Sequence, residues 1–358
     1  QTLVDGKTIF PAMIEAIRGA QKSITLESFL CSSGRVCQNF MQALSERARA
    51  GVKIHILLDW MGSNELHPDH YDEMRQAGMQ IVKYRKLHWY TLPRLNYRSH
   101  RKILVVDGRI GFTGGVGIAD QWLHGRNDLP PWRDVHYRIE GPVVAKMQAA
   151  FLDNWLKSHR SVLEGDRYFP ELVSTGTLST QLFTSSADGI EAVRLMYLLS
   201  IACAKTHIRI LNAYFVPDPS LVHELIRAAH RGVSVEVLVP GPTTDQRILR
   251  EVSRSSWKKL LQAGIKIYEY QPTMHHGKLF IVDDAWVSIG SANCDGRSFT
   301  INDEMNVNVL NPAFAQEQIA IFEEDKTQSR LVTYQQWKKR SRWGKAIGNA
   351  GRIILGQF

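Results

Sequence analysis

One pattern of reactive side chains occurs twice in the 358-residue chain: a histidine, any residue, a lysine, four further residues and an aspartate. The two copies are His100, Lys102 and Asp107, and His276, Lys278 and Asp283. Histidine can attack phosphorus when it is neutral and donate a proton when it is charged, because its pKa lies near neutrality. Lysine neutralises phosphate oxygens that would otherwise repel a nucleophile. The duplicated pattern therefore predicts one composite site for phosphodiester chemistry.

Each copy runs into four apolar residues, 103–106 and 279–282, as is typical of a short strand buried on both faces. In an extended chain, alternate residues point to the same side. We therefore expect the histidine and the lysine of each copy to face the site together. Arg101 and Gly277, which separate them, should point away.

The residues after each apolar run predict a hairpin. Residues 107–108 and 283–284 favour turns, and apolar residues near 110–113 and 286–289 favour a return strand. Each return strand ends in a glycine-containing loop, which the hairpin brings back to the level of the histidine. Glycine lets backbone N–H groups approach a phosphate oxygen closely. We expect Gly115, Ser291 and Asn293 to bind the substrate phosphate.

The repeat is wider than these hairpins. Residues 23–26, 50–58 and 76–81 match residues 207–210, 231–239 and 262–267 in the same order. Helices that alternate with short Val/Ile/Leu strands predict an α/β fold with a mostly parallel sheet. The period is too long for a solenoid and suits two duplicated domains. We expect domains at 1–170 and 171–330, followed by a basic amphipathic tail at 331–358.

The duplicated pattern resembles the phospholipase D superfamily. Segments 103–120, 132–134, 140–142 and 212–215 are most similar to bacterial cardiolipin synthases. The resemblance implies two duplicated phospholipase D-like α/β sandwich domains with the active site at their interface. It also implies a phosphatidyltransferase that moves a phosphatidyl group from phosphatidylglycerol to a second phospholipid, phosphatidylglycerol or phosphatidylethanolamine, through a phosphohistidine. His100 would be the nucleophile and His276 the acid/base, an order that the residues alone leave open.

Each histidine needs a partner that fixes its tautomer and orientation. The resemblance places such a carboxylate at Glu304 in the second half, and Asp134 is the candidate in the first half. We expect Asp107 and Asp283, at the strand-end turns, to pair with basic residues and brace the hairpins. His275 should face away from the site, because it is adjacent to the second reactive histidine in the same strand.

Two features concern what the site lacks. Gly117 stands where the first copy would carry the counterpart of Asn293, and cardiolipin synthases usually have asparagine there. The identity of the acceptor is therefore less certain than the reaction type.

No Asp/Glu cluster suited to two metal ions accompanies the motifs, and the four cysteines form no CxxC pair. We expect no metal and no cofactor, and small unreactive cysteines.

A net charge of +9 and a pI near 9.4 favour an anionic partner. The substrate implied by the resemblance, phosphatidylglycerol, is anionic, and nucleic acid is not the expected partner. Six cations and no acidic residue occupy residues 337–352, where tryptophan and isoleucine are interspersed. That composition favours a helix in a membrane interface. We expect the bacterial inner membrane as the location, with peripheral binding or an anchor outside this chain, which begins at Gln1.

Other functions stay open at this stage. A phospholipase D would use water as the acceptor, and a superfamily endonuclease would cut nucleic acid. A binding protein with a decayed site is disfavoured, because both histidines and both lysines are present. The segment between Gly78 and the first motif contains cations and aromatics suited to headgroups or bases. These residues are Arg85, Lys86, Trp89, Tyr90, Leu92, Arg94, Tyr97 and Arg98. Both halves lie in one chain, so a monomer suffices; the oligomeric state is not readable.

Overall fold

The computed structural model describes residues 1–86, 96–126, 129–186, 189 and 191–355, with backbone alone for 349 and 352–355. Two compact units form: Gln1–Thr177 with Asp303–Met305, and Leu178–Asn302 with Asn306–Phe358. Four residues that we expected near a headgroup lie outside the described residues: Trp89, Tyr90, Leu92 and Arg94.

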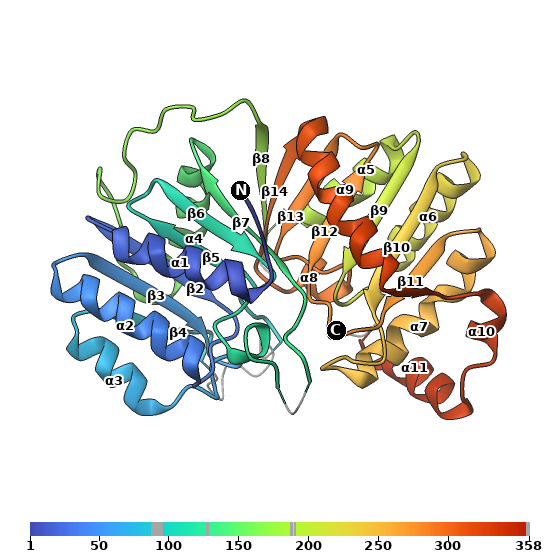
Figure 1. Ribbon diagram of the computed structural model, residues 1–358, viewed down its shortest axis with the longest axis horizontal. Helices are drawn as coiled ribbons and strands as arrows, with labels where there is room; N and C mark the ends of the chain where they lie inside the picture. The colour runs from blue at the N-terminus through green and yellow to red at the C-terminus, as the bar shows by residue number, and fades with distance from the viewer. Residues whose placement is uncertain (87–95, 127–128, 187–188, 190, 356–358) are drawn as a thin grey trace. The chain divides into compact units, whose positions relative to one another are not determined.

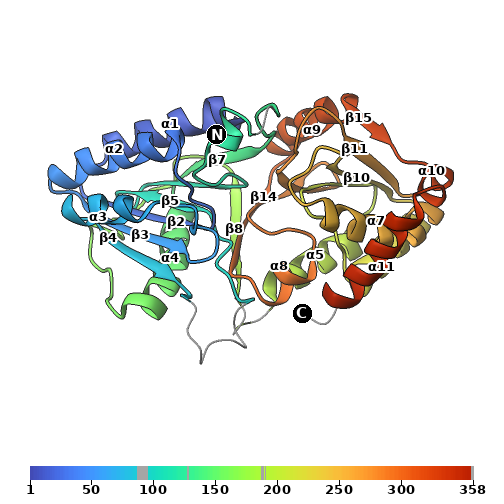
Figure 2. The same ribbon diagram turned by 90° about the horizontal axis from the view of Figure 1, so that it is seen from below.

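The first unit is built on a seven-stranded sheet in the order β1-β7-β6-β5-β2-β3-β4 (Figure 1). Its strands are β1 (Thr2–Val4), β2 (Ser23–Ser28), β3 (Lys53–Asp59), β4 (Gln80–Tyr84), β5 (Ile103–Val106), β6 (Ile110–Gly114) and β7 (Val135–Glu140). Its helices are α1 (Gly6–Gly19), α2 (Arg35–Arg49), α3 (Pro68–Gln76) and α4 (Val143–His159), with a short 3₁₀ turn at Asp120–Trp122. Helices α1 and α2 cover one face of the sheet and α4 covers the other (Figure 2).

The second unit repeats this plan on an eight-stranded sheet in the order β15-β11-β10-β9-β12-β13-β14-β8. Its strands are β8 (Ser179–Ser185), β9 (His207–Asn212), β10 (Ser234–Pro240), β11 (Lys266–Tyr270), β12 (Lys278–Val282), β13 (Trp286–Gly290), β14 (Glu304–Leu310) and β15 (Ser329–Leu331). Its helices are α5 (Ala192–Cys203), α6 (Pro219–His230), α7 (Arg247–Gln262), α8 (Gly296–Thr300), α9 (Pro312–Thr327), α10 (Tyr334–Lys338) and α11 (Arg342–Leu355). Helix α9 lies on one side of this sheet, and α5 and α7 lie on the other (Figure 2).

The expected hairpins are present, but the expectation of mostly parallel sheets is wrong. Of the strand pairs whose direction the described residues define, β2–β3, β3–β4, β9–β10 and β10–β11 are parallel. Helices connect these strands, and a helical crossover returns the chain in the same direction. The motif strands β5 and β12 pair antiparallel with β2 and β9 and with their own return strands β6 and β13. The sheets are therefore mixed, because a hairpin necessarily reverses the chain.

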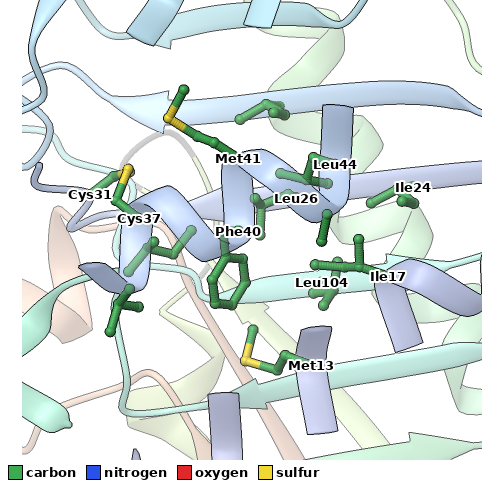
Figure 3. Close-up of a cluster of buried hydrophobic side chains, with 14 of the residues drawn as sticks. Met13, Ile17, Ile24, Leu26, Cys31, Cys37, Phe40, Met41, Leu44 and Leu104 are labelled. Atoms are coloured by element: carbon green, nitrogen blue, oxygen red, sulfur yellow. The ribbon is translucent and has the colours of Figure 1, made fainter. Parts of the chain in front are cut away.

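The core of the first unit forms where the apolar faces of α1 and α2 meet the sheet (Figure 3). Met13 and Ile17 of α1 and Phe40 and Leu44 of α2 are spaced one helical turn apart and are buried. They pack on sheet residues such as Leu104, which lies two residues after the motif lysine. Burial of each such side chain stabilises the fold by about 1.5–3 kcal/mol. The motif strand is thereby fixed from behind by the core.

The C-terminal helix α11 packs on α7 through glycines. A β-carbon at Gly348 would lie 2.6 Å from the backbone oxygen of Glu251, and one at Gly351 would meet Val252. Trp343, in contrast, is 78% exposed. Trp337 does not face outward as we expected of the tail: it is buried, and its indole N–H donates to the Arg254 carbonyl at 2.6 Å. No helix among the described residues combines the length and apolar character needed to cross a bilayer.

Candidate active site

The first motif histidine is held by a buried carboxylate. Nδ1 of His100 lies 3.0 Å from both carboxylate oxygens of Glu304, and Glu304 is fully buried. Glu304 clusters with the first unit although it begins a strand of the second sheet. This contact differs from the pairing that we expected within each half, where Glu304 would serve the second histidine. An Nδ1–H bonded to a carboxylate makes Nε2 the unprotonated ring nitrogen, which is the form that attack on phosphorus requires.

Backbone pairing fixes the segment that carries His100. The His100 N–H donates to the Asp303 carbonyl at 2.9 Å, and the Asp303 N–H donates back to the Arg98 carbonyl at 2.9 Å. Arg101 points away from the site as expected, and its guanidinium donates to the Ala150 carbonyl in α4 at 2.7 Å. Backbone hydrogen bonds to and from Asp303 therefore hold the segment that carries the histidine, and they restrict its orientation before any substrate binds.

A buried acid lies beneath this segment. Glu27 on β2 accepts hydrogen bonds at one oxygen from the Ser99 hydroxyl at 2.5 Å and from Asn154 Nδ2 at 2.7 Å. Its other oxygen has no hydrogen-bond partner among the described residues. Burial raises the pKa of Glu27 to about 7, although Arg101 and the two hydrogen bonds oppose this effect. Ser99 thus links the motif to a carboxyl that changes charge near neutral pH.

The lysine of each motif folds back on its own histidine. Lys102 Nζ donates to the His100 carbonyl at 2.9 Å, and Lys278 Nζ donates to the His276 carbonyl at 2.6 Å. Lys278 Nζ also lies 3.0 Å from His276 Nδ1. Because an ammonium can only donate, the ring nitrogen that accepts from it must be unprotonated. Within each motif the lysine side chain bends back toward its histidine, so the two lie on the same side of the segment as expected.

An aromatic ring contacts each motif histidine, and neither ring was named as a site residue from the sequence. Phe29, which follows β2, meets the His100 ring edge-on at 5.5 Å between centroids. Tyr214, which follows β9, meets the His276 ring at 5.9 Å. Both rings come from the loop after the strand next to the motif strand, so strand order was one available signal, and Tyr214 also lies in the segment 212–215 that resembles cardiolipin synthases. These rings limit how far each imidazole can turn.

His275, which we excluded, anchors the second motif from behind. Its Nε2 lies 2.8 Å from Asp325 Oδ2 in α9, and both side chains are buried. Its Nδ1 accepts the Gly277 N–H at 3.2 Å. The ring does face away from His276, as the alternation rule required, but it fastens the histidine–lysine segment to α9. The buried pair therefore positions the motif without contacting the reacting atoms.

The motif aspartates bind backbone N–H groups and not basic side chains, so that expectation is wrong. Asp107 accepts from the N–H groups of residues 21–23 at 2.7–2.9 Å. Asp283 accepts from those of residues 205–207 at 2.7–3.1 Å. Desolvation raises the pKa of Asp283, but the hydrogen bonds from Thr206, Lys205 and His207 outweigh it and lower the pKa. Both aspartates have positive φ, 52° and 51°, and join the hairpin turn to the start of the neighbouring strand.

The carboxylate of Asp134 explains why position 115, which we assigned to phosphate binding, is a glycine. The Asp134 carboxylate is fully buried, and it accepts from the Trp122 indole at 2.9 Å and from the Val135 N–H at 2.8 Å. A β-carbon at Gly115 would collide with this carboxylate. The Gly115 N–H already donates to the Val135 carbonyl at 3.3 Å. Gly115 therefore makes room for Asp134, and its assignment as a phosphate donor stays a prediction.

Packing also accounts for the glycine at position 117. A β-carbon there would lie 2.8 Å from Leu30 Cβ and 2.9 Å from the Leu30 carbonyl oxygen. Asparagine would not fit without displacing the loop that carries Phe29. In the second unit, Ser291 and Asn293 are both buried next to the end of β13, and one atom of the Asn293 side-chain amide, Oδ1, has no described hydrogen-bond partner. The two halves therefore offer different polar groups near their motifs.

A buried histidine near the first motif was not predicted to matter. His136 on β7 is buried, and desolvation lowers its pKa to about 3, opposed by Asp134 and assisted by Lys102. It is therefore neutral at physiological pH and cannot replace the motif histidine as a proton donor. Within the described part of the chain, no three His, Cys, Asp or Glu side chains are grouped so as to hold a metal ion.

Sequence comparison agrees with this arrangement of side chains. The family described as cardiolipin synthase, PLD-like domain, matches residues 13–129 and 197–326, which include both motifs. The chain belongs to this family. It is 34% identical over 356 residues to cardiolipin synthase A of Pseudomonas putida (strain W619), covering 98% of this chain and 73% of that protein. It is 33% identical over 359 residues to a cardiolipin synthase of Clostridium perfringens, covering 98% and 74%.

The fold has a counterpart among solved structures. The phosphatidylserine synthase of Haemophilus influenzae superposes with a TM-score of 0.76 over 100% of this chain and 93% of that one, at 15% sequence identity. At that identity the likeness concerns the fold. It supports the duplicated phospholipase D-like α/β architecture that the sequence predicts.

Proposed function

We propose that the protein is a cardiolipin synthase that transfers a phosphatidyl group from phosphatidylglycerol to a second phospholipid. The observation that carries the proposal is the His100–Glu304 pair, in which a buried carboxylate fixes one ring nitrogen and leaves the other for attack. Two complete motifs and family membership over both of them agree with this chemistry. The names of the curated relatives supply the reaction, because the side chains alone do not distinguish acceptor lipids.

In the proposed mechanism, Nε2 of His100 attacks phosphorus and the P–O bond to the departing glycerol breaks. His276 donates a proton to that glycerol and then removes one from the incoming hydroxyl. Lys102 and Lys278 neutralise the phosphate oxygens, with Ser291 and Asn293 as neutral donors. Asp134 and Glu304 act as orienting carboxylates, and Asp107 and Asp283 brace the hairpins.

We further propose that the second unit rests on the membrane through the helices on one side of its sheet. Four exposed apolar side chains on α5 and α11 support this: Leu195, Leu199, Trp343 and Ile347. Between Trp337 and Arg352 the chain carries only basic charges. An exposed tryptophan among cations suits the surface of an anionic bilayer. A bacterial inner membrane, with peripheral or additional anchoring, is consistent with the bacterial relatives.

The deciding experiment is to incubate the protein with phosphatidylglycerol vesicles and to analyse lipids by mass spectrometry. Cardiolipin and free glycerol are the expected products, and His100→Ala and His276→Ala should each lower turnover by at least about 10³-fold. Circular dichroism checks that both variants keep the fold. Phosphatidic acid alone would instead identify a hydrolase, and cleavage of single-stranded DNA without any lipid turnover would identify a nuclease.

A further inference from the structure

A carboxylate outside both motifs lies over the second one. Asp245 is in the loop between β10 and α7, and its carboxylate accepts a hydrogen bond from the Tyr214 hydroxyl at 2.6 Å. Tyr214 is the residue whose ring meets the imidazole of His276. Asp245 and Lys278 also interact electrostatically. All four side chains belong to the second unit, so this cluster is defined within one compact body.

The position of this carboxylate is unusual for a site that binds an anion. A negative charge near Lys278 opposes the phosphate that the lysine would neutralise. The residue as a whole stays exposed, yet its carboxyl end is desolvated enough to raise its pKa, against the hydrogen bond from Tyr214. Such a group adds nothing to phosphate binding. It can bind a hydrogen-bond donor attached to the phosphate, because an ionised carboxylate has several acceptor positions and the hydroxyls of Tyr214 and Thr244 occupy only part of them.

We infer that Asp245, oriented by Tyr214, binds the polar headgroup of the phospholipid whose phosphate contacts His276 and Lys278, and so selects headgroups that donate hydrogen bonds. This inference rests on the proposed phosphatidyl transfer. The glycerol of phosphatidylglycerol carries two hydroxyl donors, and an ammonium headgroup carries N–H donors. A plain alkyl headgroup has no donor. A site built to bind a hydroxyl discriminates against the analogue without it, because its partly desolvated carboxylate then loses a hydrogen-bond partner.

Competition between two alcohols in one reaction tests this selection. Vesicles of unlabelled phosphatidylglycerol are incubated with equal concentrations of deuterated glycerol and 1-propanol, and the two exchanged lipids are measured by mass spectrometry. In each exchange the P–O bond to the departing glycerol breaks as the P–N bond forms. The incoming alcohol then forms a new P–O bond as the P–N bond breaks, and it gives up its proton to the base that protonated the departing glycerol. Both products come from one intermediate, so their ratio is independent of how much enzyme is folded.

The wild-type enzyme should favour glycerol, and Asp245→Ala should reduce the glycerol-to-propanol ratio about tenfold or more. Asp245→Asn retains one acceptor oxygen without the charge and should give an intermediate ratio. Tyr214→Phe keeps the ring beside His276 but frees the carboxylate, and should lower the ratio by a smaller factor. Glu317→Ala removes an exposed acid of α9, outside the cluster, and should leave the ratio unchanged.

The outcomes separate this inference from the proposed function. If wild-type enzyme exchanges neither alcohol and makes no cardiolipin, the phosphatidyl-transfer proposal itself fails. If wild-type enzyme exchanges glycerol and the ratio is the same in Asp245→Ala and Asp245→Asn, the headgroup role of Asp245 is overturned. A uniform loss of both products at a constant ratio would make Asp245 only a support for Tyr214. Parallel vesicles with phosphatidylethanolamine as the phosphatidyl donor, which releases ethanolamine, show whether the selected hydrogen-bond donor is a hydroxyl or an ammonium.

Discussion

Glu27 is an acidic residue whose environment excludes water. It is fully buried below the first motif, and its pKa of about 7 compares with an ordinary value of 4.5. A raised carboxyl pKa means that stability is fully present below pH 4.5, where folded and unfolded chains both bind the proton. That stability is lost as the pH rises through the folded pKa near 7. The difference corresponds to roughly 3 kcal/mol.

We therefore predict that Glu27→Gln changes the pH dependence of stability. The variant should gain up to roughly 3 kcal/mol relative to the wild type between pH 4.5 and pH 8, because glutamine stays neutral. Urea unfolding followed by tryptophan fluorescence at several pH values measures the difference. Glu46→Gln, at a partly exposed ion pair with Arg18, is the matched control and should show no such trend. Parallel curves for the wild type and Glu27→Gln would contradict the assignment of a buried titrating acid.

At the residue scale, motif spacing predicted the positions of the histidines and lysines, and the resemblance supplied Asp134 and Glu304 as candidate carboxylates. Neither signal could predict which carboxylate contacts which histidine, because Glu304 is far from His100 in the sequence and contacts it only in the folded chain. His275 was excluded by an alternation rule that correctly gave its direction but said nothing of Asp325 behind it. Asp245 carries no motif and lies in a loop. Its role depends on contacts that exist only once the fold is formed.

At the scale of elements, the apolar runs predicted the motif strands and their hairpins to within a residue or so. The relative directions of the strands were mispredicted. The prediction rested on the parallel strands β2–β4 and β9–β11 and left out the antiparallel strands of each sheet. Strands β7 and β14 were not predicted, although they carry or adjoin Asp134 and Glu304. The residues of β7 and β14 alternate almost strictly between polar and apolar, so the period-2 signal was present in the sequence but was not used.

The seam between α7 and α11 yields a prediction for one element. Gly348→Leu should displace α11, because even a β-carbon there would approach the Glu251 carbonyl and Ser255 too closely. Limited trypsin cleavage after Lys345 should accelerate about tenfold, with the rest of the chain intact. Ala346→Leu adds the same side chain at an exposed position of α11 and should leave the cleavage rate unchanged. Equal rates for both variants would mean that the glycines do not hold the helix.

For the molecule as a whole, the proposed membrane contact would combine charge with apolar surface. The net charge of +9 attracts the chain to anionic lipid over the range of a Debye length, an effect that added salt screens. Trp343 can add apolar contact that salt does not screen, because burial of an aromatic side chain depends on area. The two contributions are therefore separable by ionic strength.

We predict that Trp343→Ala lowers partitioning onto phosphatidylglycerol-containing vesicles about tenfold, and that this factor persists at high salt, whereas binding of the wild type itself weakens as salt rises. Sedimentation with sucrose-loaded vesicles at two salt concentrations measures both effects. Leu331→Ala, at an exposed apolar residue of β15 away from α11, is the control and should bind as the wild type does. If Trp343→Ala binds as tightly as the wild type at each of the two salt concentrations, α11 does not enter the interface. The membrane contact must then be sought in the exposed leucines of α5, where Leu199→Ala provides the next comparison.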